Sequence, residues 1–255
     1  MKNLMNFPFV VFALSVLLLG LAARFGLFIQ KRRGALDEQE REDFDVILAA
    51  TLTLLGLIIG FSFSMAISRY DQRKNYEEEE ANAIGTEYLR AGLLPAADAA
   101  KVRGLLISYL DQRLLFYRTR FASQLVPVNA ATDQLEAELW SAVQAPAAAQ
   151  PTPIVALAIS GMNDVLNSQG YTQSAWWNRI PVAAWGLMAA IAICSNLLIG
   201  FGFRRVKGNS LLLIVLPLIV SISFLLIADI DSPRGGIIRV RPKNLTALSQ
   251  SLHKQ

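Results

Sequence analysis

A long apolar segment that runs directly into a charged one constrains this chain more than any other feature. The 22 residues from Val46 to Ile67 carry no charge, and as a helix they would span about 33 Å, close to the roughly 30 Å hydrocarbon core of a bilayer. The segment that follows, up to Arg90, is dense in charge, and the next proline is Pro95. Because no proline interrupts it, the sequence predicts one helix that crosses the membrane and continues into water.

Small residues recur at every fourth position of this predicted membrane helix. They are Gly56, Gly60, Ser64 and Ser68. A spacing of four places them on one face of the helix, and small residues within lipid let a second helix approach closely. The stripe therefore either packs against another helix of the same chain or faces a partner subunit or an aqueous pathway.

The rest of the chain fits an integral membrane protein with four spans. Hydrophobic residues make up 53% of the sequence and charged residues 17%, and the apolar residues gather in blocks. Three further blocks, Phe7 to Ile29, Ile180 to Phe203 and Leu211 to Ala228, are long and apolar enough to cross a bilayer. We therefore predict an all-α integral membrane protein with four transmembrane helices.

The region between the second and third spans predicts a helical extramembrane domain. Its apolar residues recur with helical spacing from about Val102 to Tyr117, from Leu135 to Val143, and from Thr152 to an expected stop at Gly170. Prolines at 127 and from 146 to 153 suggest the connectors. The expected segments are residues 1–68 (spans one and two), 69–179 (helical domain), 180–230 (spans three and four) and 231–255 (C-terminal tail).

Composition excludes several classes of function. The chain has one histidine, His253, and one cysteine, Cys194, so neither a histidine-based catalytic or metal site nor a thiolate cluster is expected. No nucleophile, phosphate-binding loop or basic face with interleaved aromatic residues is visible. We expect no enzyme activity, no cofactor, no metal site and no nucleic-acid partner.

Three clusters of polar residues are candidates for function. Arg69, Tyr70, Asp71 and Arg73 stand where the second span leaves the lipid, and form either an interfacial anchor or a charged pore mouth. Glu80, Asn82 and Thr86 adjoin apolar residues and need polar partners if they are buried.

The third cluster lies at the end of the fourth span and consists of Asp229, Asp231 and Arg234. Carboxylates are disfavoured at the C-terminal end of a helix by its dipole. We therefore expect a cation, such as Arg234 or one from the Arg69 to Lys74 region, to hold one of the two aspartates.

Charge near the spans bears on orientation. Seven basic residues flank one side of the predicted spans and five flank the other. The first group is Lys31, Arg32, Arg33, Arg41, Arg204, Arg205 and Lys207, and the second is Lys2, Arg234, Arg239, Arg241 and Lys243. Because basic flanks favour the cytoplasm, the count places the helical domain on the periplasmic side.

Several motifs resemble those of one family. SFSMAISRYDQR, EEEANAIGTEYLRAGLLP, MNDVLN, NRIP and ADIDSPRGGIIRV are similar to the bacterial bestrophin-like domain family from about Leu54 to Val240. A looser similarity to the true bestrophins, around Gly60 to Arg73, implies a pentameric ion channel in the bacterial cytoplasmic membrane, with small inorganic ions as its substrates and a pore lined by the second span. It also implies a cytoplasmic helical domain, against the charge count.

On this resemblance, Phe61 and Phe63 become candidates for a hydrophobic constriction. They lie about 200° apart around a regular helix, so they cannot both point at one axis. The rival interpretation is a non-conducting membrane scaffold or sensor whose helical domain binds a partner or lipid.

Overall fold

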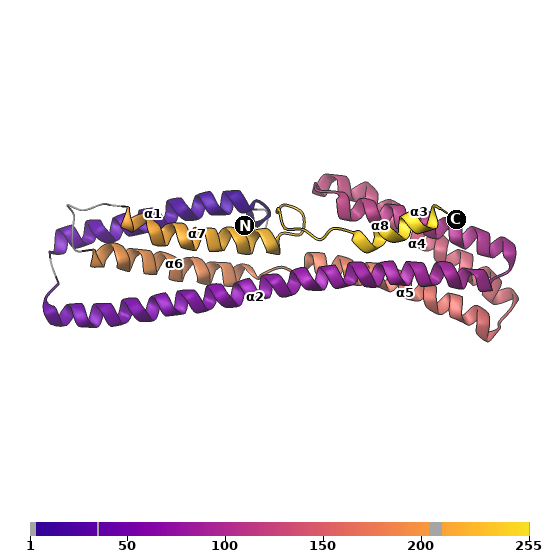
Figure 1. Ribbon diagram of the computed structural model, residues 1–255, viewed down its shortest axis with the longest axis horizontal. Coiled ribbons are helices and arrows are strands. Elements are labelled where there is room, and N and C mark those ends of the chain that lie inside the picture. The colour runs from indigo at the N-terminus through magenta and orange to yellow at the C-terminus, as the bar shows by residue number, and fades with distance from the viewer. Residues whose placement is uncertain (1–3, 35, 204–210, 255) are drawn as a thin grey trace. The chain divides into compact units, whose positions relative to one another are not determined.

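The computed structural model describes residues 4–34, 36–203 and 211–254. Within these ranges the chain is all-helical and contains no strand (Figure 1). The helices are α1 (Pro8–Arg33), α2 (Glu38–Arg90), α3 (Ala96–Arg118), α4 (Ala122–Ala149), α5 (Pro153–Trp177), α6 (Val182–Gly202), α7 (Leu212–Asp231) and α8 (Lys243–Leu252), with short 3-10 turns η1 (Leu4–Asn6) and η2 (Ala91–Leu93). The predicted all-α class is confirmed.

Four helical stretches of the described residues are long and apolar enough to cross a membrane. They are Pro8–Arg33, Glu38–Leu93, Pro153–Gly202 and Leu212–Asp231, which confirms the four predicted spans. The charged continuation of the second span is also helical, since α2 runs unbroken for 53 residues. Lys2, Arg204, Arg205 and Lys207, which entered the charge count, lie outside the described residues.

The chain divides into two compact units. The membrane unit comprises Met1–Ser68 and Arg179–Arg239, and the helical unit comprises Arg69–Asn178 and Val240–Gln255. The chain that follows α7 is thus divided, with residues up to Arg239 in the membrane unit and residues from Val240 in the helical unit. Helix α2 contributes its apolar half to the first unit and its charged half to the second.

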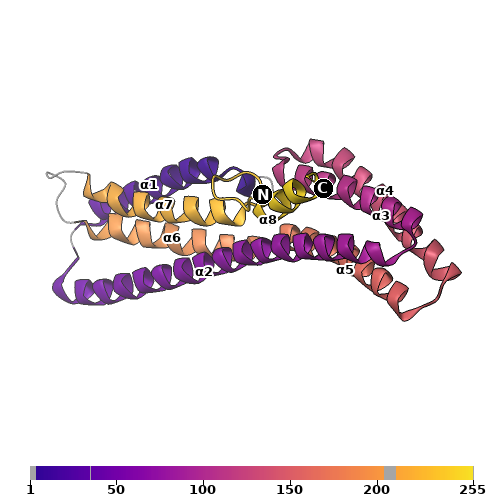
Figure 2. The same cartoon turned by 45° about the vertical axis from the view of Figure 1, so that its right-hand side comes forward.

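In the membrane unit, α1 crosses α6 at two glycines. A Cβ atom at Gly26 would lie 2.0 Å from the carbonyl oxygen of Leu197, and one at Gly200 would lie 1.9 Å from the carbonyl oxygen of Ala23. The two backbones therefore touch, as small residues permit in lipid. Helices α1, α6 and α7 lie side by side in both views (Figures 1 and 2).

The helical unit has one apolar core, contributed by α3, α4, α5, α8 and the second half of α2. Thr152 begins α5 as expected, because its Oγ1 accepts a hydrogen bond from the Val155 N–H at 3.2 Å. The expected stop at Gly170 is wrong, since α5 continues to Trp177. Trp176 is buried in the core, and this packing outweighs the low helix propensity of one glycine.

The connector expected around Pro127 is also wrong, and the one expected from Pro146 to Pro153 is shorter than expected, since only residues 150–152 separate α4 from α5. Pro127 and Pro146 both lie inside the helix, although each removes one backbone donor. Pro146 falls in the last turn, so little helix follows it. Leu139, Ala142 and Val143 are buried between the two prolines, and this apolar contact holds the segment helical.

Candidate functional site

The small-residue stripe of α2 faces away from the chain's own packing. Leu55, Ser62 and Ala66 are the buried residues of this part of α2, and they lie on one face. Gly56, Gly60, Ser64 and Ser68 are all exposed. At 100° per residue, Ser64 lies about 160° from Ser62 and about 160° from Ala66. The stripe is therefore on the opposite face of the helix.

This placement bears on the two interpretations of the stripe. A Cβ atom added at Gly56 or Gly60 would meet no heavy atom of that part within 4 Å. Gly56 and Gly60 therefore make no close contact with another helix among the described residues. A partner subunit or an aqueous pathway remains the prediction.

Phe61 and Phe63 stand on either side of the stripe. Phe61 is 62% exposed and Phe63 is partly buried. Each is about 80° from the centre of the stripe, in opposite directions around the helix. Phe61 is thus free to contact whatever the stripe faces, while Phe63 lies nearer to the chain's own packing.

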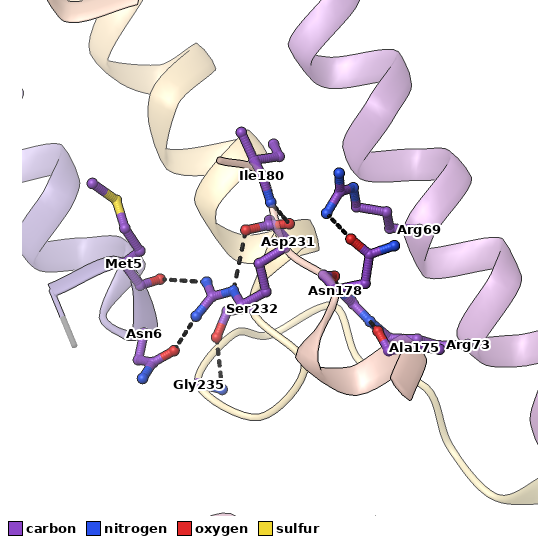
Figure 3. Close-up of polar contacts among 11 residues, drawn as sticks. Met5, Asn6, Arg69, Arg73, Ala175, Asn178, Ile180, Asp231, Ser232 and Gly235 are labelled. Atoms are coloured by element: carbon purple, nitrogen blue, oxygen red, sulfur yellow. Dashed lines mark hydrogen bonds and ion pairs between the residues drawn. The ribbon is translucent and has the colours of Figure 1, made fainter. Parts of the chain in front are cut away.

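The Arg69 to Arg73 cluster separates into bound and exposed members. The Nη1 of Arg69 donates to Oδ1 of Asn178 at 2.7 Å. Arg73 is 1% exposed, and its guanidinium donates to the carbonyl oxygens of Ala175, at 3.2 Å, and Asn178, at 3.4 Å (Figure 3). The expectation that Arg73 stands at an open pore mouth is wrong, because its charge is used to hold the end of α5 against α2.

The two remaining members differ. Tyr70 packs partly against the core of the helical unit, and Asp71 is exposed. Arg69, which is half-buried, and Asp71 are therefore the charged residues of the cluster that stay available to solvent.

Glu80 is the centre of a buried polar network. It forms an ion pair with Arg113, and its Oε2 accepts hydrogen bonds from Tyr117, at 3.0 Å, and Thr172, at 3.1 Å. Burial raises the pKa of Tyr117, so its phenol stays protonated and donates. Glu80 therefore joins α2, α3 and α5 within the helical unit.

Two other residues expected in this network do not belong to it, because Asn82 and Thr86 are exposed. Sequence reasoning also missed Arg113. The signal was its position in an apolar series with helical spacing, Leu106, Tyr109, Leu110, Arg113 and Tyr117, where a buried cation needs a partner.

Glu87 is a second buried carboxylate that the sequence pattern did not single out. It is 0% exposed, and neither carboxylate oxygen has a hydrogen-bond partner among the described residues. Burial raises the pKa of Glu87 to about 8, against an opposing effect of Arg90 and with a further rise from Asp164. The group is therefore largely protonated at neutral pH.

The aspartates at the end of α7 are held separately. The two carboxylate oxygens of Asp229 accept the backbone N–H groups of Ile237, at 2.8 Å, and Ile238, at 2.7 Å. Asp231 accepts the Arg179 Nε at 3.2 Å and the Ile180 N–H at 3.1 Å (Figure 3). A cation does hold one aspartate, since Arg179 forms an ion pair with Asp231.

Among the described residues, no group of histidine, cysteine, aspartate and glutamate is arranged to hold a metal ion. The arrangement offers instead an exposed polar stripe on a membrane helix, with bound and exposed charges in the turns that follow it. This combination suits the lining of a passage or a subunit contact.

Comparison with known proteins gives a family and a fold. The Bestrophin-like domain model matches residues 9–245. A bacterial bestrophin homologue from Klebsiella pneumoniae has a crystal structure with a TM-score of 0.63 and 16% sequence identity, over 96% of this chain and 95% of that chain. A point variant of that homologue gives a TM-score of 0.64 and 14% identity, over 95% and 94%. No curated protein sequence matches the chain.

Proposed function

Because the chain belongs to the Bestrophin-like domain family, we propose that it is an oligomeric membrane ion channel whose ion pathway is lined by α2. The placement of the Gly56 to Ser68 stripe carries this proposal. Two serine hydroxyls and two bare backbone segments lie on the face of α2 that the chain itself leaves uncovered. Such a face is poorly suited to lipid tails and well suited to water or another helix.

The low burial of α2 supports the same assignment. Of the 18 most apolar consecutive residues of this span, only 11% are buried within the chain, compared with 50% for the corresponding residues of α7. The other three spans can face the lipid, while α2 contacts the α2 helices of the other subunits around a central axis. A ring of α2 helices is the arrangement that the resemblance to the bestrophins implies, with five copies if that resemblance carries over.

Roles for the neighbouring residues follow from this arrangement. Phe61, which is exposed beside the stripe, is the better candidate for a hydrophobic constriction, since it is the less buried of the two phenylalanines. Arg69 and Asp71 would set the charge of the mouth and raise the local concentration of permeant ions.

Assembly through α2 is tested by replacing Gly60 with leucine. A Cβ atom at Gly60 meets open space within the described part of the chain, so we expect Gly60→Leu to leave the fold of the single chain intact. If α2 helices meet at the stripe, the larger side chain holds them apart, and native mass spectrometry shows fewer subunits per particle than in the wild type. An unchanged subunit number removes α2 from the interface.

Orientation belongs to the same proposal. The chain is a membrane protein, and the charge count favours a periplasmic helical unit. A cysteine at Ala130, which is exposed on α4, tests this in a Cys194→Ser background. We expect labelling in intact cells by a membrane-impermeant thiol reagent. Labelling only after lysis places the helical unit in the cytoplasm.

A further inference from the structure

The helical unit contains an open pocket that the α2 pathway does not involve. It lies between the C-terminal end of α3 and the first turns of α8, and its volume is about 380 Å³. Its polar lining residues are Arg118, Arg241, Lys243, Thr246 and Gln250. All of them belong to the helical unit.

The lining of this pocket carries three positive charges and no negative charge. Arg118, Arg241 and Lys243 are exposed, and within the described residues none of them forms an ion pair. Other basic residues of the unit differ, since Arg113 pairs with Glu80 and Arg90 with Asp164. Three like charges around one space repel one another, and an anion between them relieves that repulsion.

Helix α8 is fixed in place without using these charges. The carboxylate of Glu77 accepts the backbone N–H of Leu245 at 3.0 Å and the side-chain amide of Asn244 at 2.8 Å. Leu245 is itself buried in the core. The first turn of α8 is therefore already capped by Glu77, and the cationic side chains beside it remain available for a ligand.

From this lining we propose that the pocket binds a phosphate-bearing anion. The two guanidinium groups can each engage two phosphate oxygens, and the ammonium of Lys243 supplies a third, compact charge. Gln250 adds an amide group on α8, whereas the Thr246 hydroxyl already donates to the carbonyl oxygen of Pro242. A phosphate group has the negative charge that this cationic lining lacks.

Two sources of phosphate share this chemistry, a phospholipid headgroup and a soluble phosphate. The chain reaches Arg241 ten residues after Asp231, the last residue of α7 (241 − 231). Basic residues that follow a membrane span closely are suited to anionic headgroups. The inference does not depend on conduction, since the pocket lies outside the proposed pathway.

The test compares two triple variants of the full-length protein. In the pocket variant Arg118, Arg241 and Lys243 are replaced by glutamine. In the control variant Lys101, Arg120 and Lys254, which are exposed on the same unit and do not line the pocket, are replaced by glutamine. Both variants lose three positive charges, so a general electrostatic effect changes them equally.

Binding is measured for two probes, inorganic phosphate by calorimetry on detergent-solubilised protein, and phosphatidylglycerol as retained adducts in native mass spectrometry. We expect the wild type and the control variant to bind at least one probe, and the pocket variant to bind it at least about tenfold more weakly. Binding of phosphate identifies a soluble ligand, and binding of phosphatidylglycerol alone identifies a headgroup. Absence of binding for both probes, or equal weakening in both variants, overturns the proposal.

Discussion

Arg179 and Asp231 form an ion pair that joins the two ends of the α6–α7 segment, with Nε of the arginine 3.2 Å from Oδ2 of the aspartate. The same guanidinium donates to the Met5 carbonyl oxygen at 3.2 Å and to the Asn6 side chain. Asp231 also accepts the Ile180 N–H. The contacts of this one pair therefore tie η1, the segment before α6 and the end of α7 together (Figure 3).

Loss of this pair should destabilise the membrane unit. Asp231 is 1% exposed. Asp231→Asn removes the charge that pairs with Arg179, whose side chain is only partly exposed to water. We expect a loss of about 1–3 kcal/mol in the free energy of unfolding, read as a lower thermal midpoint of the solubilised protein. Asp71→Asn, at an exposed position, serves as the control and should change the midpoint little. Equal midpoints for the two variants would show that the pair does not hold the unit together.

The α1–α6 crossing makes a second prediction about stability. Gly26→Ala would place a methyl group against the backbone of α6, whereas Gly20→Ala on the same helix meets no described atom within 4 Å. The first change should force the helices apart and lower the free energy of unfolding by about 1–3 kcal/mol. The second should be neutral or slightly stabilising, since alanine favours helix over glycine. Two variants that unfold alike would contradict the close crossing.

Glu87 should make stability depend on pH. Its pKa is raised from an ordinary value of 4.5 to about 8, so between these values the folded protein holds a proton that the unfolded chain has released. The free energy of unfolding therefore falls as pH rises from about 4.5 to about 8, by up to about 1.4 kcal/mol per pH unit, and levels off above 8.

The variant Glu87→Gln is neutral at every pH and should lose this contribution. Glu136 also has a pKa raised by burial, to about 7, so the informative quantity is the difference between wild type and variant. Glu79→Gln, at an exposed position of the same helix, should keep the wild-type slope. The thermal midpoints of the three proteins, recorded from pH 5 to pH 9, report this difference. Parallel curves for all three proteins would refute the raised pKa of Glu87.

The sequence predicted the spans and the helical class because both depend on local properties. An uncharged segment such as Val46 to Ile67 has the length of a bilayer, and the absence of proline until Pro95 lets α2 continue. Helix ends were less predictable. Gly170 and Pro146 look like boundaries in isolation, but burial of their neighbours in the core decides the conformation.

Partners distant in the sequence were not predictable. The cation at Asp231 comes from Arg179, 52 residues away, and in the sequence Arg179 looks like any basic residue before a span. The α1–α6 crossing had a weak signal in the sequence, since Ala22 and Gly26 are four residues apart, but this pair is shorter than the series of four small residues on α2. The tertiary arrangement shows that a Cβ atom at Gly26 would touch α6, whereas one at Gly56 or Gly60 would meet no described atom within 4 Å.

The most direct test of the proposed function is conduction through a protein with one cysteine on the stripe. Ser64→Cys in a Cys194→Ser background is reconstituted into planar bilayers and treated with a small charged thiol reagent. Leu17→Cys, on an exposed part of α1, is the matched control. If α2 lines the pathway, both proteins pass current, and the reagent blocks it irreversibly in Ser64→Cys alone. Bilayers that stay silent, or a current that the reagent leaves unchanged in both variants, would contradict an ion pathway along α2.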